Sequence, residues 1–488
     1  MSIPSSYDRA PYDSKPAASC HIDRLCTLGR LFGLSPAPVE PCRVLDLGCA
    51  EGGHLIPMAV NLPRSEFLGL DLSRKQIETG RGIIAALGVK NIALEPADLM
   101  AVDDSFGRFD YIICHGVYSW APPEVQEKIF RIGQANLAPQ GVAYVDYNTY
   151  PGWFMLETIR DLMRFHLEGL DDPEEGMDQA LFIAEVLARY VGAESEYARC
   201  IRSELEHIVR AGRSPFRHAL LYHEYLEGVN RPLYFHEFVR RAAAYGLQYL
   251  GEADAADMHP VGFPDRLIEV LSGLKQDQVR YEQYLDFLCH RRFRRTLLCR
   301  EGLVVDRDIK PADIPGFLAA ATTGLTLELV EQTEVVPLAK AALIRLLEKR
   351  PRAVKVGPLL DEALARLEPA PAGPDERQQA RLAAAADFIR FYHSNMIQLL
   401  TWQADFTLSP GPRPRLNPLA ALQAGRGQAW LTNQVHEPVL LPPPLMALAK
   451  LLDGRRDRAA LAGLLGLGNE EALDPLLSQI AAKALLVA

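Results

Sequence analysis

Residues 43–56 read Arg43-Val44-Leu45-Asp46-Leu47-Gly48-Cys49-Ala50-Glu51-Gly52-Gly53-His54-Leu55-Ile56. The stretch predicts a short buried strand, then a loop of glycine and other small residues, then the start of an apolar helix. Open α/β sheets present their backbone to nucleotide-like ligands in this order. The loop lacks the G-x-G-x-x-G pattern that a dinucleotide site requires, and by itself it fits a ligand site and a bare turn equally well.

Acidic residues at the ends of three predicted strands favour a ligand site. Asp46 can accept a hydrogen bond from an ammonium group, and Asp71 in FLGLDLS is placed to accept from both hydroxyls of a ribose. In LEPADL, Asp98 can accept from an adenine amino group while the Leu99 N–H reaches a ring nitrogen, although an Asp in this position also commonly caps a turn. Taken together, the three acids indicate an adenosyl ligand.

The pattern of apolar residues predicts a parallel α/β sheet with right-handed connections. The expected strands are 43–47, 66–71, 91–94, 109–114 and 141–147, and the expected helices between them are 53–61, 74–86 and 123–137. A helix over 21–34 is expected to cover the entrance to the sheet. Later segments predict helices at 155–169, 177–191 and 194–211, a strand at 247–250, and an edge strand or loop at 296–305.

Composition limits the possible functions. A chain of 488 residues predicts two to four domains, and its net charge of -10 argues against nucleic acid as a main partner. The eight cysteines include no C-x-x-C pair, which indicates reduced thiols and no metal site. No signal segment and no apolar run of about 18 residues is present, so we expect a cytoplasmic protein without a membrane span.

Several motifs together resemble one family. They are YDRAPYDSKP, VLDLGCAEGGHLIPMA, GLDLSRKQIETG, FDYIICHGVYSWAPPEV, LAPQGVAYVDYNTYPGW and HEYLEGVNRPLYFHEFVRRAAAYGLQYLGEA, with LLDGRRDRAAL near the C-terminus. The chain resembles the bacterial class I S-adenosylmethionine-dependent methyltransferases that carry a methyltransferase regulatory domain. That group includes protein lysine methyltransferases of rickettsial outer-membrane proteins.

The resemblance implies an α/β fold, with a Rossmann-like class I methyltransferase sheet followed by mainly helical regulatory and winged-helix-like domains. We expect a methyltransferase domain with an N-terminal lid over 1–165 and a regulatory domain over 166–305. A helical middle region with Pro-rich linkers is expected over 306–434, and a winged-helix-like domain over 435–488.

The resemblance also implies S-adenosylmethionine as cofactor. Residues Gly48, Ala50 and Gly52 would then line its methionine part, near Asp46, and Asp71 with the adjacent Leu72 would hold the ribose. Asp98 and Leu99 would hold the adenine, and His115 would face the sulfonium. Many class I enzymes have glycine where Ala50 stands, so we expect a negative φ at Ala50.

Methyl transfer from a sulfonium is an in-line displacement that chiefly requires an oriented, neutral nucleophile. The candidates for catalysis are His115, Tyr118 and Tyr147, and those for binding the acceptor are Trp120, Asn148, Tyr150 and Trp153. His115 has an ordinary pKa of about 6.5 and can take a proton, or its ring is structural. The aromatic rings can surround an alkylammonium group, or they simply pack.

The preferred acceptor is a protein lysine, because the additional domains offer an extended surface. N- or O-methylation of a small molecule and a non-catalytic, cofactor-binding regulator stay open as alternatives, and no sequence feature indicates an oligomeric state. The spacing of His218, His223 and His236 does not fit a metal site. The arginines of RRFRR (291–295) fit a solvated helix face better than an anion site, with binding of an acidic acceptor or partner as the alternative.

Overall fold

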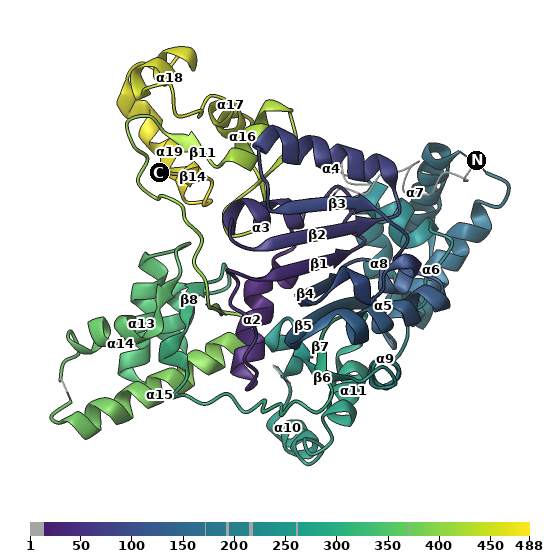
Figure 1. Cartoon of the computed structure of the whole chain (residues 1–488), viewed down its shortest axis with the longest axis horizontal. Helices are drawn as coiled ribbons and strands as arrows, with labels where there is room; N and C mark the ends of the chain where they lie inside the picture. The colour runs from purple at the N-terminus through teal and green to yellow at the C-terminus, as the bar shows by residue number, and fades with distance from the viewer. Residues whose placement is uncertain (1–13, 171, 192–194, 214–217, 260–261, 370) are drawn as a thin grey trace.

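The computed structural model describes residues 14–170, 172–191, 195–213, 218–259, 262–369 and 371–488. Its centre is a seven-stranded sheet in the order β3-β2-β1-β4-β5-β7-β6 (Figure 1). The strands are β1 (Arg43–Leu47), β2 (Glu66–Asp71), β3 (Ile92–Pro96), β4 (Phe109–Cys114), β5 (Leu137–Asn148), β6 (Leu247–Glu252) and β7 (Phe293–Arg300). The predicted Rossmann-like sheet is therefore confirmed.

Strands β1 to β5 are parallel, whereas β7 pairs antiparallel with both β5 and β6. Of the edge strand or loop predicted at 296–305, residues 296–300 belong to strand β7 and the remainder is loop, but the edge position was wrong, because β7 lies between β5 and β6. The sheet also runs across the expected boundary between residues 165 and 166, since β6 and β7 come from the second segment. The four-part domain division stays a prediction.

Helices cover both faces of the sheet, which explains why its strands are apolar almost throughout. Successive residues of β1 point to opposite faces, so Val44 joins one hydrophobic core and Leu45 joins the other. The first core is covered by α2 (Ile22–Leu31), α3 (Leu55–Asn61) and α4 (Arg74–Leu87). The second core is covered by α5 (Pro123–Asn136) and α9 (Phe235–Ala243).

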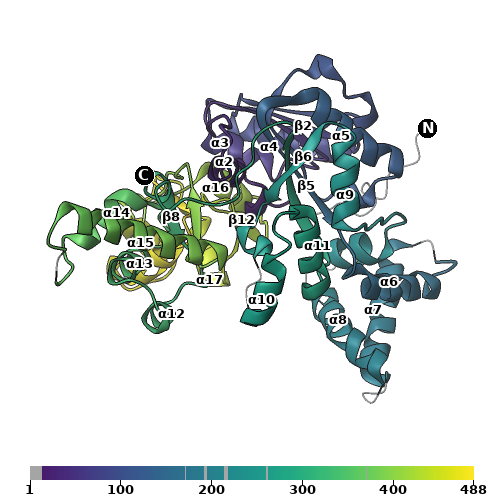
Figure 2. The same ribbon diagram turned by 90° about the horizontal axis from the view of Figure 1, so that it is seen from below.

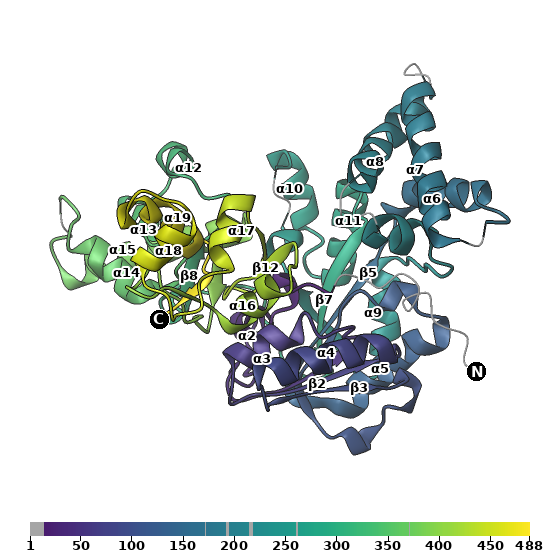
Figure 3. The same cartoon turned by 90° about the horizontal axis from the view of Figure 1, so that it is seen from above.

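A helical insertion separates β5 from β6. It consists of α6 (Trp153–His166), α7 (Pro173–Tyr190), α8 (Glu196–Gly212) and the π-helix η5 (His218–Leu226). These helices share a core of their own that includes Trp153, Met177 and Leu205. Figures 2 and 3 show α7 and α8 projecting away from the sheet as a pair. The next helices, α10 (Asp265–Ser272) and α11 (Gln278–Cys289), lead into β7.

The middle of the chain packs against the N-terminal helix. Its elements are β8 (Leu318–Ala321), α12 (Leu327–Gln332), α13 (Pro337–Glu348), β9 (Val354–Lys355), α14 (Val356–Leu364), α15 (Pro374–His393) and β10 (Ile397–Leu400). Arg24 of α2 donates a hydrogen bond from Nη2 to Gln398 Oε1 at 2.7 Å, and the Thr401 N–H donates to Asp23 Oδ1 at 2.8 Å. The first core of the sheet continues into these helices.

The C-terminal region has a separate hydrophobic core, whose residues come from the part of the sequence between Leu416 and Leu486. It contains β11 (Arg415–Leu416), α16 (Pro418–Gly425), β12 (Trp430–Thr432), β13 (Pro438–Leu440), α17 (Pro443–Ala449), α18 (Arg458–Leu464), α19 (Asp474–Ala481) and β14 (Leu486–Val487). Strand β11 pairs with β14, and α16 packs against α4 of the sheet (Figure 1). We call residues 415–487 the C-terminal unit.

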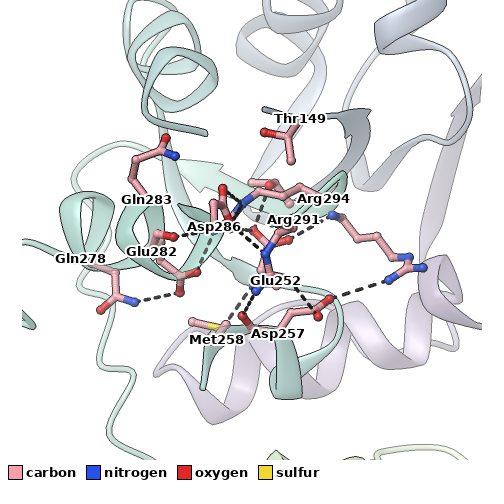
Figure 4. Close-up of polar contacts among 12 residues, drawn as sticks. Thr149, Glu252, Asp257, Met258, Gln278, Glu282, Gln283, Asp286, Arg291 and Arg294 are labelled. Atoms are coloured by element: carbon pink, nitrogen blue, oxygen red, sulfur yellow. Dashed lines mark hydrogen bonds and ion pairs between the residues drawn. The ribbon is translucent and has the colours of Figure 1, made fainter. Parts of the chain in front are cut away.

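A buried ion-pair network joins β6, β7 and α11 (Figure 4). The fully buried Arg294 binds Glu252 at 2.6 Å, Asp286 at 2.7 Å and Glu282 at 3.1 Å. Its guanidinium carbon also lies 3.8 Å from the centre of the Phe235 ring. The prediction of a solvated helix face at 291–295 was wrong, because most of these residues belong to a strand inside the sheet, where alternate side chains point into the core.

Among the described residues, no helix combines the length and the apolar composition needed to span a bilayer.

Candidate active site

The loop after β1 has an unusual backbone. Gly48 and Gly52 have φ of +84° and +77°, a region in which a side chain is disfavoured, and a Cβ on Gly48 would lie 2.4 Å from Val117 Cγ2. Ala50 has φ of +51°, so the expectation of a negative φ there was wrong. A left-handed backbone at alanine costs about 1 kcal/mol or more, and the hydrogen bond from its N–H to Asp71 at 2.8 Å compensates for it.

Asp71 connects this loop to helix α4. Its Oδ2 accepts the Ala50 N–H, and its Oδ1 accepts the Ser73 N–H at 2.8 Å. Ser73 in turn caps α4 by accepting from the Gln76 N–H. A carboxylate at the tip of β2 is thus oriented by the backbone on both sides.

Asp98 occupies the corresponding place after β3. It accepts the Met100 N–H at 2.9 Å and caps the short 3₁₀ helix η2 (Leu99–Ala101). The turn-capping interpretation of Asp98 is therefore present in the structure. Capping through one oxygen is compatible with a second role, because Asp98 is exposed and lines the same cavity as Asp71.

His115 follows β4 and is held by Asp146 of β5. The two side chains form an ion pair through His115 Nδ1 and Asp146 Oδ2, and Asp146 also accepts from the Gly116 N–H at 2.7 Å and the Tyr144 hydroxyl at 3.1 Å. Burial lowers the pKa of His115, but the Asp146 carboxylate raises it, and the net shift is upward. The side chain is 37% exposed because it faces the open cavity.

Asp46 lies beneath this pair and is almost fully buried. Burial raises the pKa of its carboxyl to about 7, and the negative charges of Asp71 and Asp146 act in the same direction, whereas His115 acts against them. The charges of Asp71, Asp146 and His115 therefore act on the protonation of Asp46 at the carboxyl ends of the strands.

A single cavity of about 570 Å³ opens along these strand ends. Of the predicted cofactor and acceptor residues, those that line it are Gly48, Ala50, Asp71, Leu72, Asp98, Leu99, His115, Trp120, Asn148 and Trp153. The part of the cavity beyond His115 we call the helical chamber, which is lined by Trp120, Asn148, Trp153, Leu156, Glu204, His207, His223, Glu224, Tyr225, Arg292 and Phe293.

Five predicted residues do not line the cavity: Asp46, Gly52, Tyr118, Tyr147 and Tyr150. The predicted catalytic contact by Tyr118 and Tyr147 does not fit this geometry, because both rings are buried against Phe238 in the second core. The Tyr147 hydroxyl forms a hydrogen bond with Thr296 Oγ1 at 3.1 Å. Residues alternate between faces along a strand, so a place near its end does not suffice to reach the cavity.

Tyr150 and Gly52 do not line the cavity and have other contacts. The Tyr150 ring stacks on Phe154, and its hydroxyl donates to Glu157 at 2.8 Å. Gly52 faces the core, where an added Cβ would lie 3.0 Å from Leu94 Cδ1. Its contribution is to the shape of the loop.

Sequence reasoning did not identify most of the helical chamber. Glu204 and His207 come from α8, Glu224 and Tyr225 from η5, and Phe293 from β7. No motif marks these positions, since they come together only when the insertion folds back on the strand ends. His223 and Arg292 had been noted in the sequence without any link to the cavity.

A histidine cluster lies on the other side of the loop. It consists of His21, His54 and His436 with Cys20, and it joins the N-terminal helix, the glycine loop and the C-terminal unit. His436 Nε2 lies 2.8 Å from His54 Nδ1, and Cys20 Sγ lies 3.4 Å from His54 Nε2. Burial holds the pKa of His54 and of His436 well below their usual range, and lowers that of His21 to about 4. Within the described residues, no group of three or more His, Cys, Asp and Glu is arranged to hold a metal ion.

The histidine cluster predicts that the folded protein loses stability in acid. The unfolded chain takes up protons on these histidines below pH about 6.5, whereas the folded protein keeps them neutral, so stability is complete above that pH and falls as the pH drops toward 4. Each histidine contributes a slope of about 1.4 kcal/mol per pH unit. Urea denaturation between pH 7.5 and 5 should show a shallower pH dependence in His436→Gln. The control His166→Gln changes an exposed histidine and should match wild type; equal slopes in all three proteins would contradict the prediction.

Three segments of the chain match known families. Residues 39–175 match a "Methyltransferase domain", residues 217–300 a "Predicted methyltransferase regulatory domain", and residues 412–472 a "PKMT, C-terminal winged helix domain". An uncharacterized protein of Rickettsia prowazekii, RP028, is 38% identical over 238 residues, which cover 49% of this chain and 93% of that protein. This chain belongs to the class I S-adenosylmethionine-dependent methyltransferases with a methyltransferase regulatory domain.

Other proteins are similar to larger shares of the chain. RP789 of Rickettsia prowazekii, also uncharacterized, is 40% identical over 312 residues, so the match spans 64% of this chain and 55% of that longer protein. The solved structure of PKMT2 from Rickettsia typhi is similar over 98% of this chain and 100% of its own length, with a TM-score of 0.85 and 26% identity. Its complex with AdoHcy gives a TM-score of 0.84 at 27% identity. The cofactor of this methyltransferase is S-adenosylmethionine.

Proposed function

We propose that this methyltransferase transfers the methyl group of S-adenosylmethionine to lysine side chains of a protein. The observation that carries the proposal is the single cavity that joins the glycine loop to the helical chamber, because cofactor and acceptor must meet in one water-poor space. The similarity to PKMT2 over nearly the whole chain and the match to a PKMT winged-helix domain support a protein acceptor.

The residues of the cavity fit the cofactor. The positive φ angles of Gly48 and Ala50 shape a loop that the methionine part can approach closely, near the Asp46 carboxyl group. Asp71 with Leu72 takes the ribose, and Asp98 with Leu99 takes the adenine. When bound, the cofactor supplies an electrophilic methyl group.

The protein groups beyond the cofactor bind and orient the acceptor. A lysine amine has an ordinary pKa of about 10.4 and must lose a proton before it can attack. His115 is assigned to that end of the cavity, with its ring fixed by Asp146 and its upward-shifted pKa suited to receiving the proton. Trp120, Asn148 and Trp153 would contact the acceptor chain.

We also propose a cytoplasmic location and no nucleic-acid partner. All eight cysteines are free thiols and six of them are buried, as is usual in a reducing compartment. The net charge of -10 would oppose binding to a polyanion.

The deciding experiment incubates the full chain with methyl-labelled S-adenosylmethionine and a fractionated bacterial lysate, followed by mass spectrometry of the labelled species. We expect the label on lysine Nε atoms of one or a few proteins. A labelled small molecule would instead support the alternative of a biosynthetic N- or O-methyltransferase. Tight cofactor binding with no labelled acceptor would support a non-catalytic regulator.

A further inference from the structure

The helical chamber contains two carboxylates in different situations. Glu204 is fully engaged, since its Oε1 accepts from the Tyr225 hydroxyl at 2.7 Å and its Oε2 pairs with Arg292 Nη1 at 2.8 Å. Its charge is balanced, and its contacts hold the tyrosine and the arginine in place. Glu204 therefore shapes the chamber and is poorly placed to bind a second cation.

Glu224 differs from Glu204 in its partners and in the balance of its charge. Glu224 is exposed, and it lines the cavity. No hydrogen bond or ion pair to its carboxylate is found among the residues that the structure describes. Burial raises the pKa of this carboxyl, while the charge of Arg292 opposes the shift. The chamber thus holds one carboxylate that lines the cavity and has no direct partner among the described residues.

Two tryptophans line the same cavity as Glu224. The Trp120 and Trp153 rings meet edge to face with their centroids 6.2 Å apart, and both line the cavity. Trp153 is buried in the core of the insertion, and Arg160 lies over Trp120, so neither ring turns freely. Aromatic walls suit the aliphatic part of a lysine side chain, and their faces attract an ammonium group.

We propose that Glu224 is the specificity-determining residue of the acceptor site, and that it selects a cationic alkylammonium side chain over a neutral one of the same length. The inference rests on the proposed function, because it names the group that recognises the lysine. The ammonium group of the acceptor binds Glu224 in the cavity that Trp120 and Trp153 also line, and Arg292 is paired with Glu204 instead of Glu224.

The test compares two small probes, n-butylammonium chloride and n-butanol, on the full chain saturated with S-adenosylhomocysteine. Binding is followed by the fluorescence of the tryptophans. We expect wild type to bind the ammonium about tenfold or more tightly than the alcohol, since a charge-assisted hydrogen bond to a carboxylate is stronger than a hydrogen bond between neutral groups. Glu224→Gln should lose this preference, and Glu224→Asp should keep part of it.

The matched control is Glu206→Gln, which removes an exposed carboxylate on α8 that does not line the cavity and should leave the preference unchanged. Unchanged affinity for S-adenosylhomocysteine shows that each variant is folded. Equal binding of both probes by wild type, or an undiminished ammonium preference in Glu224→Gln, would overturn the proposal. An ammonium preference in a protein that labels no lysine in a lysate would instead refute the proposed function and leave the cation site standing.

Discussion

Replacing Arg294 by methionine is expected to lower the free energy of unfolding by about 3–5 kcal/mol, because it leaves buried carboxylates without their cation. Glu252, Glu282 and Asp286 all have no exposed side-chain surface, and each binds Arg294 directly. Arg291 is the remaining cation near them, and it is shared between Asp286 at 2.7 Å and Asp257 at 2.9 Å. Urea denaturation at neutral pH measures the loss.

Two further variants test whether the uncompensated carboxylates cause the loss of stability in Arg294→Met. Arg64→Met removes an arginine that is 71% exposed and paired with Glu40, and it should cost no more than about 1 kcal/mol. Combining Arg294→Met with Glu252→Gln and Glu282→Gln should recover much of the stability, since the uncompensated charges are then gone. A loss in Arg294→Met as small as that in Arg64→Met would show that the network contributes little.

The sequence predicted the parallel part of the sheet well, because β1, β2 and β4 are short, mainly apolar segments with a polar or glycine residue at or directly after their ends. It failed for β7, since RRFRR has the composition of a solvated surface. Only the pairing of β7 between β5 and β6, together with the acids of β6 and α11, makes a buried arginine possible there. Such long-range charge compensation leaves no local pattern in a sequence.

The strand-end side of the cavity could be predicted from the sequence, whereas the helical chamber could not. Asp71, Asp98 and His115 lie at or just after the ends of β2, β3 and β4, so their meeting at one sheet edge could be predicted once the strands were placed. Glu204 and Glu224 sit on helices of the insertion, and nothing in their neighbourhood distinguishes them from surface acids. The backbone of Ala50 was beyond prediction for a related reason, because its positive φ depends on a hydrogen bond to Asp71.

Asp71→Ala is expected to weaken binding of S-adenosylmethionine about 100-fold or more, measured by calorimetry. The substitution removes the carboxylate that we assign to the ribose, and each hydrogen bond to a charged group contributes about 1.5–3 kcal/mol. It also leaves the N–H groups of Ala50 and Ser73 without their acceptor, so the glycine loop loses the contact that holds its left-handed turn.

Asp71→Asn separates these two effects. Its amide oxygen can still accept one of the two backbone N–H groups, whereas its NH₂ cannot accept from a ribose hydroxyl. If the carboxylate acts mainly through the ribose, Asn should bind the cofactor nearly as weakly as Ala; if it acts mainly by shaping the loop, Asn should recover part of the affinity. Glu78→Ala, an exposed carboxylate on α4, is the control and should bind as wild type does. Near-normal affinity in Asp71→Ala would refute the assignment of this cavity to the cofactor, because no other carboxylate on its lining is fixed to both the loop and α4.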